Sequence, residues 1–139
     1  MSESGNQDRI RAHYTGTLGA RLFRNNVGVL LDKTGRPVRY GLGNDSKAMN
    51  ETIKSGDLIG WTPRLVTPDM VGSVVAEFLS VEVKADGWKF PRPGPTHDAK
   101  GRLTAYGHAM AQLRWAQMVR AEGGSAGFMI DPNRGFEPC

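Results

Sequence analysis

Alternating apolar positions along the chain predict one long central strand. The run SVVAEFLSVEVKA (73–85) is rich in β-branched residues and has the length of a strand inside a sheet. Side chains on a strand alternate between its two faces, so Val74, Ala76 and Phe78 share a face with Glu82 and Lys84. The strand therefore has one face that changes from apolar to charged along its length.

The rest of the pattern predicts shorter elements on both sides of this strand. A weak amphipathic helix is expected over Gln7–Tyr14, and a β-hairpin over Leu22–Leu42, where the cluster DKTG forms the turn. The polar stretch GNDSKAMNETIKSG (43–56) reads as turns, and DLIGWTP (57–63) as a short apolar run closed by proline. A helix is expected over Thr104–Glu122 and a last strand in SAGFMI. The apolar stripe of that helix is Ala109, Leu113, Ala116 and Val119.

A loop rich in proline, glycine and basic residues separates the long strand from the following helix. It covers about 86–103 and includes KFPRPGPTHDAKGR, whose prolines and glycines prevent a regular element. The order of helix, hairpin, strands, helix and strand predicts an α/β fold, a mixed β-sheet flanked by helices. The 139 residues suit a single domain, 1–139.

Composition narrows the possible environments. The chain is 39% hydrophobic and 23% charged, and no apolar run approaches the roughly 20 residues that a membrane helix needs. The polar start MSESGNQDRIRAH lacks the apolar segment of a secretory signal, so a cytoplasmic protein without a membrane partner is expected. A single cysteine, Cys139, excludes an internal disulfide. The net charge of +4 permits a polyanionic partner without requiring one.

Asp57, Glu82 and Lys84 have the chemistry that phosphodiester cleavage requires. Asp57 opens one short strand and Glu82 lies near the end of another, so pairing of the two strands would place their Cα atoms about 5 Å apart. Neighbouring carboxylates repel each other unless a cation lies between them, and the carbonyl of Val83 could add a further oxygen ligand. Lys84 could orient or help to deprotonate a water. A solvated pair of surface charges is the alternative interpretation of Glu82 and Lys84.

Several motifs together resemble a known nuclease family. GDLIG followed by VEVKA looks like the D…ExK signature of the PD-(D/E)XK nucleases. The segments LFRNNVG, RYGLG, KSGDLIGWTP, VEVKADGW, QLRWAQMVRAEGG and AGF follow in the order of its VRR-NUC (virus-type replication-repair nuclease) branch. The resemblance covers about 22–128.

The resemblance implies a DNA endonuclease, dependent on Mg²⁺ or Mn²⁺, with a PD-(D/E)XK core. Small members, often phage-encoded, are similar to DNA-repair enzymes that cut branched DNA such as four-way (Holliday) junctions, and they are commonly homodimers. Asp57, Glu82 and the Val83 carbonyl would be metal ligands, Lys84 and Gln112 catalytic residues. Gln112 precedes Ala116 by four residues and so could lean over the sheet. The family usually adds a glutamate on the first helix, for which Glu3 and Asp8 are the candidates here.

DNA contacts are harder to predict from the sequence. Arginine, lysine and asparagine side chains can bind backbone phosphate, and a tryptophan can stack on a base. Each also has an ordinary alternative, namely a solvated surface position, a hydrogen bond within the fold, or local packing for the tryptophan. The candidates are Arg24, Asn26, Arg39, Lys47, Lys54, Trp88, Lys89 and Arg92.

Other functions stay open at this stage. The fold could cut flaps, linear duplex DNA or RNA in place of junctions, or it could bind DNA without cutting it. An intact acid pair with its lysine favours the enzyme over the binding protein, because a binding protein does not need them. The three histidines show no i, i+4 pairing and no nearby cysteine, so a zinc site is not expected.

Overall fold

The chain forms a mixed four-stranded sheet with a helix on each face and a separate hairpin at one end. The computed structural model describes all 139 residues. The strand order in the main sheet is β1-β4-β5-β6, with only the β5–β6 pair parallel, and β2 pairs with β3 alone. The mixed sheet flanked by helices confirms the predicted α/β class. The elements are α1 (Glu3–Leu18), β1 (Arg21–Arg24), β2 (Gly28–Leu31), β3 (Pro37–Tyr40), α2 (Lys47–Thr52), β4 (Leu58–Leu65), η1 (Pro68–Met70), β5 (Val74–Val83), α3 (Ala105–Ala121) and β6 (Ser125–Met129).

Two apolar clusters hold the helices to opposite faces of the sheet. Ile10 and Tyr14 of α1 pack with Leu79, Val81 and Val83, the odd-numbered positions of β5. On the other face, a cluster centred on Trp115 of α3 packs against the sheet, and the Trp115 indole nitrogen donates to Ser80 Oγ at 2.9 Å. Glu82 and Lys84 belong to this second face. The helix α3 therefore lies over the charged end of β5.

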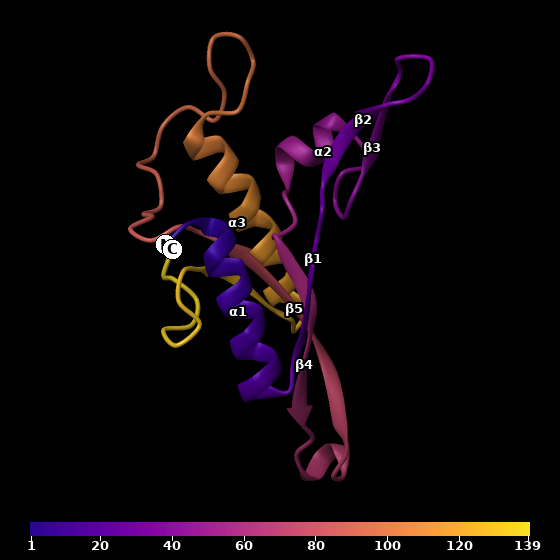
Figure 1. Cartoon of the computed structure of the whole chain (residues 1–139), viewed down its shortest axis with the longest axis vertical. Coiled ribbons are helices and arrows are strands. Elements are labelled where there is room, and N and C mark those ends of the chain that lie inside the picture. Colours follow the sequence, from indigo (N-terminus) through magenta and orange to yellow (C-terminus); the bar gives the residue numbers. More distant parts are fainter.

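The molecule is elongated, with loops and hairpins at both ends of the sheet (Figure 1). The β2–β3 hairpin and α2 lie at one end, beside the start of α3, and the β4–β5 connection through η1 projects at the other. The 86–103 segment is irregular, as the sequence predicted, apart from an isolated bridge between His97 and Leu103. No helix has both the length and the apolar character required to cross a bilayer.

The run predicted as the first strand of the hairpin is in fact two strands in two sheets. β1 pairs with β4, whereas β2 pairs with β3. The break falls at Asn25, whose backbone N–H donates to the Asp57 carbonyl and whose side chain donates to Ser55 Oγ and the Gly56 carbonyl. These bonds turn the chain away from the sheet, so the hairpin prediction holds for Gly28–Tyr40 and is wrong before it.

Helix boundaries also differ from the sequence prediction. α1 is twice as long as predicted because Ser2 caps it, with its side chain accepting from the Gly5 N–H. The stretch interpreted as turns contains the short helix α2, capped in the same way by Ser46. β4 continues past Pro63 to Leu65. Proline is tolerated there because β1 begins at Arg21, opposite Trp61, so that the rest of β4 has no ladder partner on that side.

Candidate functional site

Asp57 and Glu82 come together where β4 and β5 meet. Leu58 pairs with Val81 in the antiparallel ladder, so the next positions along it are Asp57 and Glu82. Asp57 is held in place because its Oδ2 accepts the Val83 N–H at 2.8 Å and its carbonyl accepts the Asn25 N–H at 2.8 Å. The strand pairing expected from the sequence is therefore present, and two acidic side chains lie next to each other.

The surroundings of Asp57 and Glu82 disfavour the charged form of both carboxylates. Burial first, and then the Asp57 carboxylate, raise the pKa of Glu82 to about 8, with Lys84 acting in the opposite direction. Burial also raises the pKa of Asp57, against the Val83 N–H and Lys84. Glu82 is buried in the structure, with 8% of its surface exposed. A buried carboxylate next to a half-buried one favours either a bound proton or a nearby cation.

Lys84 and Gln112 complete a closed set of hydrogen bonds around Glu82. The Lys84 ammonium lies 2.9 Å from Glu82 Oε1 and 3.1 Å from Gln112 Oε1. Gln112, buried on α3, donates its Nε2 to the same Glu82 oxygen. The structure thus brings together all four residues that the sequence proposed as catalytic: Asp57, Glu82, Lys84 and Gln112.

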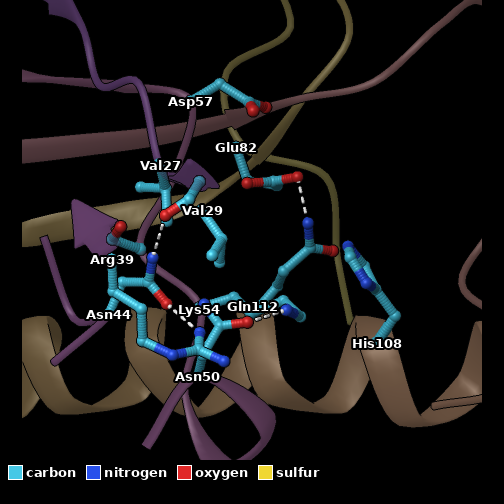
Figure 2. A pocket seen from close by; sticks show the side chains of 12 residues that line it. Val27, Val29, Arg39, Asn44, Asn50, Lys54, Asp57, Glu82, His108 and Gln112 are labelled. Carbon is cyan, nitrogen blue, oxygen red and sulfur yellow. Dashed lines mark hydrogen bonds between the residues drawn. The ribbon is translucent and has the colours of Figure 1, made fainter. Parts of the chain in front are cut away.

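A cavity of about 230 Å³ opens beside the acid pair (Figure 2). Asp57, Glu82 and Gln112 line one part of it. Arg39 of β3 and Lys54, which follows α2, line the wall contributed by the hairpin and α2. The cavity is therefore acidic on one wall and basic on the opposite one, a distribution suited to a phosphate held near a cation.

Local hydrogen bonds position the basic wall. The Arg39 guanidinium donates to Asn44 Oδ1 at 2.9 Å, and the Lys54 ammonium donates to Asn50 Oδ1 at 2.6 Å. The Lys54 N–H also donates to the Ala111 carbonyl of α3, which joins this segment to the helix that carries Gln112. Burial lowers the pKa of Lys54, with Glu51 and Glu82 acting against that effect.

His108 is a site residue that the sequence reasoning missed. It lines the cavity next to Gln112 (Figure 2). Desolvation, followed by the charges of Lys54 and Lys84, lowers its pKa. The available signal was the i, i+4 spacing of His108 and Gln112, which places both on one face of α3.

The residues at the acid pair fit a hard divalent cation. Carboxylate oxygens from Asp57 and Glu82 and the carbonyl of Val83 are the oxygen donors that Mg²⁺ and Mn²⁺ prefer. Asp57 and Glu82 have no histidine, cysteine, aspartate or glutamate beside them that would make a cluster of three such side chains. Glu3, in the first turn of α1, is near enough for its charge to raise the pKa of Glu82 further. Asp8 lies elsewhere, in an exposed ion pair with Arg24.

The remaining predicted DNA contacts are not part of this cavity. Arg24 pairs with Asp8 at 3.6 Å, and Lys47 pairs with Glu51 at 3.6 Å. Asn26 lines a neighbouring groove with Tyr40, while Lys89 and Arg92 lie exposed in the 86–103 loop. The Trp88 ring stacks on Phe128 with centroids 4.9 Å apart, so local packing occupies one face of the indole.

Comparisons with protein-family models, with curated proteins and with solved structures gave no match. The function must therefore be argued from the geometry and electrostatics of the cavity. The features that any function has to explain are the pair of half-buried Asp57 and buried Glu82, the lysine and glutamine bonded to Glu82, and the basic wall across from the pair.

Proposed function

We propose that the chain is a divalent-metal-dependent endodeoxyribonuclease that hydrolyses phosphodiester bonds, with branched DNA such as four-way junctions as its substrate. The observation that carries this proposal is the pair formed by half-buried Asp57 and buried Glu82, beside Lys84 at the edge of a cavity with a basic wall. Withdrawing such charged groups from water costs stability, and a cluster of this kind often marks a functional site. The same residues match the D…ExK pattern of the PD-(D/E)XK nucleases, including the VRR-NUC branch.

Asp57, Glu82 and the carbonyl of Val83 would hold Mg²⁺ or Mn²⁺. When bound, the cation would neutralise the acid pair, lower the pKa of a water and polarise the scissile phosphate. Without it, burial and then the Asp57 carboxylate raise the pKa of Glu82. Glu3 is the better placed of the two acidic residues considered on the first helix, because Asp8 is paired with Arg24.

The other side chains divide the remaining tasks. Lys84 orients the attacking water, and its positive charge favours release of the water's proton to solvent, because its ammonium group is fixed beside the acid pair by two hydrogen bonds. Gln112 is a positioning residue that fixes both Glu82 and Lys84. Arg39 and Lys54 bind the phosphate from the opposite wall and offset the negative charge that develops on it.

The preference for branched DNA and the assembly as a homodimer rest on the resemblance. Cutting both strands of a four-way junction symmetrically needs two active sites, which a twofold dimer supplies. Flaps, linear duplex and RNA present the same phosphodiester to the cavity, so they belong in the same assay.

The test is cleavage of labelled four-way junction, flap, linear duplex and RNA with Mg²⁺, Mn²⁺ or chelator. We expect cleavage only with the cations. Lys84→Ala should slow single-turnover cleavage by about 10²–10⁴-fold, the usual contribution of a positioned acid or base. Glu82→Ala should abolish cleavage while DNA binding remains. Lys33→Ala, which removes an exposed lysine from the hairpin turn, is the matched control and should cleave normally.

Gln112→Ala should lower the rate less, by about tenfold, because the two hydrogen bonds that position Glu82 and Lys84 are lost while both of these side chains remain. Undiminished cleavage by Lys84→Ala or Glu82→Ala would remove the proposed centre. A wild-type protein that binds DNA under all these conditions and never cuts it would establish the alternative, a DNA-binding protein without enzymatic activity.

A further inference from the structure

A second groove lies beside the β2–β3 hairpin and meets the acidic cavity at Asp57. Its volume is about 630 Å³, and its walls include Leu30 and Tyr40 of the hairpin and Asn26, which precedes the hairpin. Asp57 and Ser55 line both the groove and the cavity. Sites for small organic ligands commonly measure roughly 300–1,000 Å³. The groove is therefore large enough to hold a ligand group, and it adjoins the proposed reaction centre.

The hairpin presents a different face to each of these two spaces. Its register pairs Gly28 with Tyr40 and Val29 with Arg39. Successive side chains of a strand point to opposite faces, so Arg39 and Tyr40 point away from each other. Arg39 lines the acidic cavity, whereas Tyr40 and Leu30 line the groove. The hairpin thus separates a space suited to phosphate from a space with an aromatic and an aliphatic wall.

The Tyr40 ring occupies space that only a glycine at position 28 leaves free. A Cβ atom on Gly28 would lie 2.7 Å from Tyr40 Cζ, too close for the ring to stay where it is. Glycine inside a strand often marks such a close approach. The Tyr40 carbonyl accepts from the Asn44 side chain at 2.9 Å, so the backbone is also held. Tyr40 nevertheless keeps 42% of its surface exposed, which leaves part of the ring free for a ligand to stack on.

The chemistry of the groove suits a nucleobase better than a phosphate. Asp57 is the one charged residue in its lining, so a phosphate would find no basic partner there. A planar base can stack on the tyrosine and pack against the leucine. Asn26 is exposed, and its amide can both donate to and accept from the edge of a base. The neighbouring Asn25 is not available for this role, because its side chain already bonds to Ser55 and Gly56.

We propose that this groove is a subsite for one unpaired nucleobase, that of the nucleotide next to the scissile phosphate, with the Tyr40 ring as its stacking platform. The inference rests on the proposed nuclease function and adds a feature of the substrate that the site recognises. A single sugar joins a base to its phosphate, so a phosphate held at Asp57 directs a base into a space beside that residue. The cavity already contains the acid pair and the basic wall, and the groove is the other space that Asp57 lines.

This arrangement selects for DNA in which a base next to the cut is not stacked in a duplex. A base inside an intact duplex must first leave its stack, which costs free energy. A base at a branch point or in a single strand has already lost part of that stacking. The subsite therefore binds strands near a branch more tightly than continuous duplex.

Abasic sites placed one at a time along one strand of a labelled four-way junction test the subsite. Binding is measured by fluorescence anisotropy with Ca²⁺ in place of Mg²⁺, and a gel checks that the strands stay intact, so the result does not depend on cleavage. We expect one position near the branch at which loss of the base weakens binding by about fivefold or more. This is the lower end of what the stacking of one base contributes.

Tyr40→Ala should weaken binding of the intact junction by a similar factor. It should also remove the sensitivity to that abasic site, because both changes delete the same contact. Tyr40→Phe keeps the ring and should behave as the wild type. Leu30→Ala should weaken binding of the intact junction, whereas the matched control Leu31→Ala should not. Leu31 is 70% exposed and points to the opposite face of the same strand.

The abasic scan with the wild type keeps the test valid if Tyr40→Ala folds poorly. Wild-type binding that is insensitive to the abasic site at every position overturns the proposal, and so does a folded Tyr40→Ala variant that keeps the full sensitivity. Failure of the proposed function gives a different result, in which the sensitivity at one position persists but no DNA is cut with Mg²⁺ or Mn²⁺. The base subsite would then belong to a protein that binds DNA without cutting it.

Discussion

The surroundings of Glu82 disfavour the charged form of its carboxylate. Burial and the neighbouring Asp57 raise its pKa, while Lys84 and Gln112 bond to a single oxygen of its carboxylate. These groups act as one unit, since each has the others as its nearest polar partners. Removing any one of them leaves a buried polar atom without a partner, which usually costs about 1–3 kcal/mol. The site is therefore a source of instability that a bound cation would relieve.

The raised pKa of Glu82 predicts how stability depends on pH in the absence of divalent cations. Between about pH 4.5 and 8 the folded state holds a proton on Glu82 that the unfolded state has released. The free energy of unfolding should therefore fall as pH rises through this window, by at most about 1.4 kcal/mol per pH unit. Urea titrations with chelator at pH 5 to 8 measure it. His108 acts in the opposite direction, because its lowered pKa makes the free energy of unfolding rise as pH rises.

Glu82→Gln isolates the contribution of Glu82, because the amide is neutral at every pH. Its stability should change less between pH 5 and 8 than that of the wild type. Asp45→Asn removes an exposed carboxylate and should keep the wild-type slope. Equal slopes in wild type and Glu82→Gln would mean that Glu82 is charged throughout.

At the scale of elements, the β2–β3 hairpin depends on one buried asparagine. Asn44 donates to the carbonyls of Gly28 and Tyr40 and accepts from Arg39. It therefore closes the base of the hairpin and positions the arginine of the basic wall at the same time. A two-stranded ribbon of this kind has little stability of its own, so such bonds decide whether it stays folded.

Asn44→Ala should lower the free energy of unfolding by about 2 kcal/mol, because two partly buried carbonyls lose the donor that the buried Asn44 side chain provides. Chemical denaturation measures this loss. Asn26→Ala, at an exposed position next to the hairpin, serves as the control and should change stability by less than about 0.5 kcal/mol. If the two variants are equally stable, the hairpin is held by other contacts.

At the scale of the whole molecule, cation binding should link the site to global stability. Asp57 directly precedes β4 and Glu82 lies on β5, and these are the two interior strands of the sheet, so a ligand that joins the two residues stabilises the centre of the fold. Mn²⁺ at about 100 times its dissociation constant should add about 2.7 kcal/mol to the free energy of unfolding.

Thermal melting with Mn²⁺, Mg²⁺ or monovalent salt of equal ionic strength measures this effect. The divalent cations should raise the melting temperature of the wild type and leave that of Asp57→Asn nearly unchanged. Equal shifts in both proteins would place cation binding away from the acid pair.

Local pattern was enough to predict the elements with strong periodicity and the shared face of Glu82 and Lys84. Residues two apart on a strand must point the same way whatever surrounds them. The alternation in 73–85 therefore predicted β5, and the i, i+4 relation to Ala116 directed Gln112 toward the sheet. Boundaries set by capping, as at Ser2 and Ser46, were missed because one hydrogen bond decides them.

Tertiary structure decided which segments meet. The sequence carries Asn25 within an apparent strand, but only its bonds to Ser55 and Gly56 end β1 and send the chain into a second sheet. In the same way, His108, Arg39 and Lys54 face one cavity because three elements converge there. The sequence by itself determined the side-chain directions and the chemistry of the acid pair. The fold determined the basic wall opposite it, since the free energy of such contacts depends on residues far apart in the chain.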